Sequence, residues 1–182
     1  MTTALVPIAD GTEELEAVTI IDVLRRAGVA VTVASVNGPR VTCSHGVALA
    51  ADCRISDCAG KAFHAIALPG GMPGAEHLRD CAALTTLLKE QAAAGRIVAA
   101  ICASPVVVLH HHGLLNERKA TAYPGMAADL AHHHESGAPV IVDGHFINSK
   151  GPGTAMAFAL ALVRALRGAA VEKEVAAAML VG

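Results

Sequence analysis

Short apolar runs alternate with helical segments along the whole chain, and this alternation limits the fold more than any other feature. Apolar runs at 4–8, 29–36, 63–68 and 97–101 are rich in aliphatic residues and end at polar, glycine-containing or proline-containing breaks. Strands that alternate with helices at this spacing form β-α-β units. The sequence therefore predicts an α/β protein with a mostly parallel sheet and helices on both faces.

The remaining elements follow the same logic. Predicted helices cover 13–27, 75–94, 154–166 and 171–179, a short helix starts near Pro105 and ends at 110–113, further strands cover 120–122, 140–142 and 146–148, and a hairpin joins 41–43 to 47–51. Composition is even along the chain, without a linker or a repeat. We therefore expect one domain over residues 1–182.

The composition argues against several classes of protein function. The chain is 53% hydrophobic with a mean hydropathy of +0.49, but its longest nearly apolar stretch, 97–109, is shorter than the roughly 20 residues that span a bilayer. A net charge of −2 with no basic patch speaks against a nucleic-acid-binding surface. Five cysteines, no C-x-x-C pair and no targeting signal predict a cytoplasmic protein with free thiols.

A cysteine stands where a predicted buried strand passes directly into a predicted helix. The strand 97–101 is followed by Cys102, Ala103 and Ser104, and such small neighbours permit the sharp turn of a nucleophile elbow. Free N–H groups and the dipole at a helix N-terminus favour the thiolate, so we expect Cys102 to be a reactive thiol. The alternative is that Cys102 is a small buried apolar side chain, the usual fate of a free cysteine; for the other four cysteines this plain interpretation is preferred.

Glu16 falls on the apolar face of the helix predicted for 13–27. At about 100° per residue, Ile20, Leu24 and Ala27 all lie within about 80° of Glu16. A carboxyl group in apolar surroundings has a raised pKa, so Glu16 is expected to be protonated near neutral pH and to exchange a proton with a substrate. The alternative is that Glu16 complements the helix N-terminus or leans out to water.

The two neighbouring glutamates are expected to behave differently. Glu14 comes out about 160° from Glu16, toward the polar side of the helix, and Glu13 can reach water through the first turn. Glu16 follows the first strand, as Cys102 follows the strand 97–101, and ligands of such sheets bind outside the carboxyl ends of the strands. We therefore expect Glu16 and Cys102 to share one edge of the sheet.

A glycine pair follows the predicted strand 63–68, in the segment 68–74 (LPGGMPG). Gly70 and Gly71 allow the backbone to approach a ligand closely, and successive N–H groups there can form an oxyanion-binding nest. The alternative is an ordinary tight loop. The segment is neither a Walker loop nor G-x-G-x-x-G, so no nucleotide cofactor is expected.

Four ordered segments resemble the DJ/ThiJ/PfpI superfamily, in its Parkinson-disease deglycase branch and particularly its bacterial YajL-type members. They are 11–18 (GTEELEAV), 68–71 (LPGG), 99–103 (AAICA) and 151–154 (GPGT), and the match runs nearly end to end. The resemblance implies a flavodoxin-like three-layer sandwich, usually a homodimer, with Cys102 as the oxidation-sensitive thiol and Glu16 as its partner. It implies no metal and no organic cofactor.

Three positions depart from that family pattern. Tyr123 stands where many relatives place a histidine before proline; a tyrosine is a poor base at neutral pH but can donate a hydrogen bond, so we expect slow turnover. Ala103 follows Cys102 where the protease-like branch has histidine, which speaks against a Cys-His hydrolytic dyad. His45 stands where relatives often carry arginine, so a contact shared with the partner subunit is not expected to carry over.

Two histidine runs, 110–112 and 132–134, look like metal ligands at first sight. Adjacent residues on a helix project about 100° apart, so a run cannot converge on one ion. We expect capping or solvated helix ends instead, because histidine is common near helix C-termini.

The leading functional hypothesis is thiol chemistry on small α-oxoaldehydes, such as methylglyoxal or glyoxal, or on their early adducts. Cys102 attacks the aldehyde, N–H groups near Gly71 and Ala103 hold the oxyanion, and Glu16 moves protons between adjacent carbons. This describes a glutathione-independent glyoxalase or deglycase that protects against oxidative and carbonyl stress.

A second hypothesis belongs to another class of protein. Cys102 is oxidised without turnover, and the protein is a redox sensor or a holdase-type chaperone. A thiamine-pathway or amidase role is a third possibility, which rests on inherited family names alone.

Overall fold

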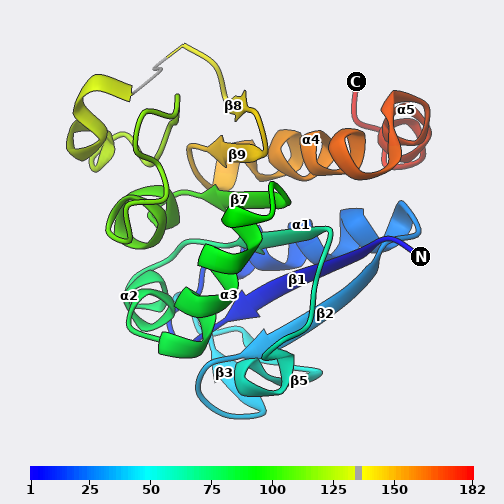
Figure 1. Cartoon of the computed structure of the whole chain (residues 1–182). Helices are drawn as coiled ribbons and strands as arrows, with labels where there is room; N and C mark the ends of the chain where they lie inside the picture. Colours follow the sequence, from blue (N-terminus) through cyan, green and yellow to red (C-terminus); the bar gives the residue numbers. More distant parts are fainter. Residues whose placement is uncertain (134–136) are drawn as a thin grey trace.

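A seven-stranded sheet organises the molecule, as a computed structural model that describes residues 1–133 and 137–182 shows (Figure 1). The strands are β1 (Thr3–Ile8), β2 (Ala30–Ser35), β5 (Cys53–Arg54), β6 (Ala65–Leu68), β7 (Ile97–Ile101), β8 (Val140–Asp143) and β9 (Phe146–Ser149). Their order is β5-β2-β1-β6-β7-β9-β8. Every neighbouring pair is parallel except β8 with β9, which confirms the expected flavodoxin-like α/β fold.

Helices cover both faces of this sheet (Figure 1). The α-helices are α1 (Glu14–Arg26), α2 (Gly74–Arg79), α3 (Ala82–Ala93), α4 (Ala155–Arg167) and α5 (Ala169–Ala178), and shorter helical segments are η1 (Ile55–Cys58), η2 (Pro105–His110), η3 (Ala127–His133) and η4 (Pro152–Thr154). Residues of α1, α4 and α5 share one apolar core, and residues of α2, α3, η1 and η2 share the other. Within the described residues, no helix is long and apolar enough to cross a membrane.

Alternation along the central strands separates the two cores. In β7, Ala99 and Ile101 face the core beneath α1 and α4, whereas Val98 and Ala100 face the core beneath α2 and α3. Both faces of a parallel strand are buried, so the strand needs apolar residues at every position. Small side chains such as alanine let the helices pack close to the sheet.

The hairpin predicted around 44–46 is present as a separate two-stranded antiparallel sheet. Its strands are β3 (Arg40–Thr42) and β4 (Ala48–Ala50). The tip is held to the start of α1 because the Ser44 N–H donates to the Thr12 carbonyl at 2.9 Å. The hairpin therefore covers the first turn of α1.

The structure differs from the sequence prediction at three places. The helix predicted for 75–94 is two helices, because Cys81 adopts an extended conformation between α2 and α3. Residues 120–122, which the structure describes, do not form the predicted strand and make only an isolated bridge at Ala120. The chain then turns at 123–127, and the Tyr123 N–H donates to the carbonyl of Cys102, just after β7. The sequence also gave no sign of β5 and η1, which are too short for a periodic pattern.

Candidate active site

Cys102 lies at a strained junction just after β7. Its φ of 65° places a non-glycine residue in the left-handed region, a conformation that costs free energy and is concentrated at functional sites. The junction is held on both sides, since the Cys102 N–H donates to the Ser149 carbonyl at 3.0 Å and the Cys102 carbonyl accepts the Tyr123 N–H at 2.8 Å. This geometry is the sharp turn from strand to helix that was expected before η2.

The glycine pair after β6 packs directly against this junction. A Cβ atom added at Gly70 would lie 2.6 Å from Cys102 Cβ and 3.0 Å from Glu16 Oε2, closer than a real side chain allows. Gly71 has a φ of 89° and its backbone abuts that of Glu13. Both positions therefore require glycine, and the loop brings its N–H groups to the thiol and the carboxyl.

Glu16 is fully buried, as its place on the apolar face of α1 predicts. Its Oε2 accepts the Gly70 N–H at 2.7 Å, while its Oε1 is buried without a hydrogen-bond partner among the described residues. Burial raises the pKa of Glu16 to about 7, although hydrogen bonds from Gly70 and Cys102 act in the opposite direction, and the negative charge of Glu13 raises the pKa further. The expected raised pKa is thus confirmed, and Oε1 is free to carry the proton.

The expectation that Cys102 favours the thiolate is wrong for the resting site. Burial and the neighbouring Glu16 carboxylate raise the pKa of Cys102 to about 12, although N–H groups of Gly71 and Ala103 donate to the sulfur and lower it. The six-residue η2 offers too little helix to offset the loss of water. Two adjacent negative charges are disfavoured here, so Glu16 and Cys102 compete to retain a proton.

A small pocket of about 190 Å³ opens beside the thiol. It is lined by Gly71, Met72, Cys102, Ala103, Tyr123 and Met126. Tyr123 is half exposed at this pocket, so the structure brings it together with the predicted thiol and glycine loop. The sequence reasoning missed the two methionines, because an isolated methionine in a loop carries no pattern.

Gly151 also lies close to the thiol. A Cβ atom added there would lie 4.0 Å from Cys102 Sγ and 3.5 Å from the Tyr123 ring. The residue belongs to the segment 151–154 that carries part of the family resemblance, which was the signal available for it in the sequence. Its missing side chain leaves room between the tyrosine and the sulfur.

Glu14 is buried as well, contrary to its expected place on the polar side of α1. The hairpin tip covers it: the His45 N–H donates to both carboxylate oxygens at 3.0 and 3.1 Å, and the Val47 N–H donates to Oε1 at 3.3 Å. Burial by itself would raise the pKa of Glu14, but these hydrogen bonds, with those from its own N–H and from Ser44, outweigh it and lower the pKa to about 2.

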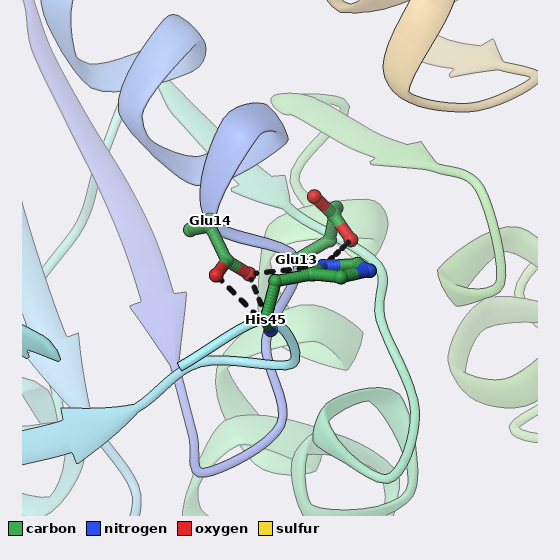
Figure 2. A group of neighbouring side chains, drawn as sticks. All are labelled: Glu13, Glu14 and His45. Atoms are coloured by element: carbon green, nitrogen blue, oxygen red, sulfur yellow. Dashed lines mark hydrogen bonds and ion pairs between the residues drawn. The ribbon is translucent and has the colours of Figure 1, made fainter. Parts of the chain in front are cut away.

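Glu13, Glu14 and His45 form the one group of described side chains that could share a cation (Figure 2). His45 Nδ1 lies 3.2 Å from Glu13 Oε2 and 3.5 Å from Glu14 Oε2, and the Ser44 hydroxyl lies 3.0 Å from both carboxylates. Hydrogen bonds within the protein thus already hold these groups together. The backbone N–H groups of His45 and Val47 hold the hairpin to Glu14, and the His45 side chain is largely exposed.

The histidine runs do not converge on a site in the described residues. His110 and His111 are exposed, and His112 Nε2 bonds to the Arg79 carbonyl at 2.9 Å, so it caps the end of α2. In the second run, His134 lies outside the described residues, and so do the side chains of 132–133.

Comparison with known proteins gives a consistent result. Residues 2–165 match the DJ-1/PfpI family. The chain is 44% identical over 183 residues to Protein DJ-1 homolog A of Arabidopsis thaliana, which covers 98% of this chain and 46% of that protein. It is 37% identical over 166 residues to a Caenorhabditis elegans protein named Glutathione-independent glyoxalase DJR-1.2, with 90% of this chain and 87% of that protein covered.

A solved structure extends the likeness to three dimensions. Oxidized DJ-1 of Toxoplasma gondii superposes with a TM-score of 0.97 and 47% sequence identity, over 99% of this chain and 98% of that chain. The chain spans less than half the length of the two Arabidopsis relatives it matches, so their whole-protein properties do not transfer directly. The motifs, the fold and these matches agree, and the chain belongs to the DJ-1/PfpI family.

Proposed function

We propose that the protein is a cysteine-dependent, glutathione-independent glyoxalase or deglycase that acts on small α-oxoaldehydes or their early adducts. The observation that carries this proposal is the contact between a strained thiol, Cys102, and a buried carboxyl, Glu16, whose pKa of about 7 lets it both give and take a proton at neutral pH. The C. elegans relative that is named a glutathione-independent glyoxalase supports the same reaction class.

The first step is addition of the thiol to the aldehyde. Burial and the Glu16 carboxylate both raise the Cys102 pKa, and protonation of Glu16 removes the second cause, so the thiol loses its proton to water most readily beside the neutral acid. Sulfur then bonds to the aldehyde carbon, and the carbonyl electron pair moves to oxygen. N–H groups of Gly71 and Ala103, which already point at the sulfur, lie where they can hold this oxygen until Glu16 protonates it.

The second step moves a proton between neighbouring carbons. The Glu16 carboxylate removes the proton from the former aldehyde carbon and returns it to the adjacent carbon, and the hydroxyl proton of the hemithioacetal passes to the oxygen of that adjacent carbon. The product is a thioester of a 2-hydroxy acid. Water then cleaves the thioester, releases the acid and restores the thiol. Overall, one water is added to methylglyoxal to give lactate, and no external oxidant or reductant is used.

The pocket size fits a substrate of this class. A volume of about 190 Å³ with small and flexible walls accommodates a three-carbon aldehyde. Tyr123 at the pocket rim offers a hydroxyl donor in place of the histidine of many relatives, which supports slow turnover.

The test is lactate formation from methylglyoxal by the purified protein in the absence of glutathione. We expect activity in the wild-type protein and in Cys81→Ala, a matched control that removes another partly buried thiol, and only background in Cys102→Ala. We expect Glu16→Gln to retain alkylation of Cys102 but lose lactate formation. Equal lactate formation in wild type and Cys102→Ala would show that the thiol mechanism is wrong.

Oxidation of Cys102 without turnover is the second candidate function. The two N–H groups directed at its sulfur support it, because they could also stabilise the negative oxygens of a sulfinate. Intact mass after mild peroxide treatment tests this candidate. Absence of preferential oxygen addition at Cys102 would exclude it, and aggregation assays with a client protein would separate sensing from chaperoning.

We also propose that the protein forms a homodimer and is located in the cytoplasm. Exposed aliphatic side chains of Leu15, Val18 and Val47 lie on α1 and the adjoining hairpin and offer a surface for a second copy. Sedimentation equilibrium of the wild-type protein and of Val18→Asp tests this: a monomeric wild-type protein would contradict it.

A further inference from the structure

Two cysteines that the sequence places five residues apart meet at the edge of the sheet. Cys53 begins β5 and Cys58 ends η1, and their sulfur atoms lie 3.8 Å apart. This is van der Waals contact between two thiols. Neither residue belongs to the Cys102 pocket, and the proposed function uses neither of them.

The backbone holds both thiols in place before any reaction. Cys53 is in register with Ala34 of β2. Between the two cysteines, the Arg54 N–H donates to the Asp57 carboxylate at 3.1 Å, and after them the Lys61 N–H donates to the Cys58 carbonyl at 3.0 Å. The fold has therefore already restricted the chain that a Cys53–Cys58 bond would close, so little further ordering opposes the bond.

The two thiols differ in their access to solvent. Cys53 is partly exposed, whereas Cys58 is fully buried. Burial and the adjoining Cys53 raise the pKa of Cys58 to about 11, so Cys58 is a neutral thiol at physiological pH. A water-soluble oxidant consequently reaches Cys53 first. Cys58 is then the resolving thiol, which attacks the oxidised sulfur of Cys53.

We propose that Cys53 and Cys58 form a second redox site, which a hydroperoxide converts reversibly into an intramolecular disulfide. The Cys53 sulfur attacks the peroxide, takes one oxygen to become a sulfenic acid and releases water. The Cys58 sulfur then attacks the sulfenic sulfur, loses its proton and expels a second water. The two thiols lose two electrons and two protons, and hydrogen peroxide is reduced to two waters.

Only a small movement is needed to complete the bond. The sulfurs approach from 3.8 Å to about 2.0 Å, a change within reach of side-chain rotation. The site is also separate from Cys102, because three strands lie between β5 and β7, which at about 4.8 Å per step puts them roughly 19 Å apart. The disulfide therefore forms without any contribution from Cys102.

Mass spectrometry tests the proposal in a Cys102→Ala background, which leaves the proposed catalytic thiol out of the reaction. After hydrogen peroxide, we expect an intact-mass loss of about 2 Da from two hydrogens, and subsequent alkylation should add two fewer alkyl groups than in the untreated protein. Trypsin cleaves after Arg40, Arg54 and Lys61, so the disulfide joins peptide 41–54 to peptide 55–61. The joined pair should disappear after dithiothreitol treatment.

Single substitutions show which cysteines form the disulfide. Peptide 41–54 also contains Cys43, so the pair must persist in Cys43→Ser and be lost in Cys53→Ser. In Cys58→Ala, Cys53 should accumulate as a sulfenic acid that dimedone labels, which checks the order of the steps even if the variant is less stable. Oxidation of Cys53 to sulfinic acid without a joined peptide in the Cys102→Ala protein, or a joined peptide that persists in Cys53→Ser, would overturn the proposal.

Discussion

Two carboxylates on the first turn of α1 stand two residues apart and differ by about five pKa units. Both are buried, yet the pKa of Glu14 is lowered to about 2 and the pKa of Glu16 is raised to about 7. Glu14 receives N–H groups and a hydroxyl from the hairpin tip 44–47, whereas Glu16 accepts a backbone N–H from Gly70.

Burial alone therefore does not determine how a carboxyl ionises in this protein. Depth of burial and the number of hydrogen-bond donors decide the outcome together. Glu16 is fully buried and has few donors, whereas Glu14 keeps 8% of its surface exposed and accepts several donors, each of which stabilises the charged form. Glu14 is a permanent anion that fastens the hairpin to α1. Glu16 is short of donors and can hold a proton, which is the property that proton transfer at Cys102 requires.

The largest expected effect comes from removing the charge of Glu16. A pKa raised from 4.5 to about 7 means that ionisation in the folded state costs about 3 kcal/mol. The native state binds more protons than the unfolded state between pH 4.5 and 7, so wild-type stability falls as pH rises through this range. Glu16→Gln should therefore stabilise the protein by about 3 kcal/mol above pH 7 and by little below pH 4.5.

Urea denaturation at pH 4.5 and pH 8 measures this difference. Glu16→Gln keeps an oxygen for the Gly70 N–H, so the comparison isolates the charge. A variant that is less stable than wild type at pH 8 would show that Glu16 does not carry the cost of burial assigned to it.

Gly70→Ala should have the next largest effect. The added Cβ would meet Cys102 Cβ at 2.6 Å and Glu16 Oε2 at 3.0 Å, so the loop must move away from both. We expect a loss of about 2 kcal/mol from overpacking, together with loss of lactate formation. Gly153→Ala is the matched control, because a Cβ there has no atom within 4 Å; equal stability losses in the two variants would contradict the close approach at Gly70.

Thiol labelling tests the link between the two sides of the site. The Glu16 carboxylate raises the pKa of Cys102, so Glu16→Gln should increase the rate of iodoacetamide labelling at pH 8, about tenfold for each unit by which the pKa falls. Glu14→Gln should leave the rate unchanged, because the hairpin already holds that carboxylate. The same pH profile of labelling in Glu16→Gln and in wild type would show that Glu16 does not influence the pKa of Cys102.

Glu14→Gln should have the smallest effect, in the opposite direction to Glu16→Gln. It loses the charge that the hairpin donors stabilise. We expect a loss of about 1 kcal/mol, less than the size of the pKa change would suggest, because Glu14 lies near the surface where water screens its charge and because the amide keeps an oxygen for the His45 N–H. The contribution of Glu14 to stability also changes with pH in the opposite direction. Because the pKa of Glu14 is lowered, its carboxylate stabilises the folded state above pH 4.5, and this contribution disappears as pH falls toward 2. Urea denaturation at pH 3 and pH 7 checks the trend, and a larger effect at the lower pH would contradict it.

Much of the fold could be predicted because its signals are local. The strand 97–101 ends at Ile101 as the apolar run predicts, and helix α1 ends just before Gly28, whose φ is 71°. The short elements β5 and η1 could not be predicted, because two to four residues contain no period. The sequence therefore carries no signal that Cys53 and Cys58 meet, although their sulfur atoms lie 3.8 Å apart.

The candidate site was predictable in its members but not in its electrostatics. The arc of apolar residues around Glu16 predicted a raised pKa correctly. The same kind of reasoning placed Glu14 on the polar side of the helix and favoured a thiolate at Cys102, and both were wrong. In each case the cause comes from distant parts of the chain: the hairpin tip covers Glu14, and burial of the thiol together with the Glu16 carboxylate raises the pKa of Cys102.

The sequence by itself determined the layered α/β architecture, the elbow at Cys102 and the inward direction of Glu16, since periodicity and turn chemistry act over a few residues. Only the tertiary structure decided which carboxylate is charged, where the protons reside and which cysteines meet. The reason is physical: ionisation depends on the donors, charges and solvent within a few ångströms, and the fold assembles these from segments as far apart as α1, the hairpin tip and the Gly70 loop.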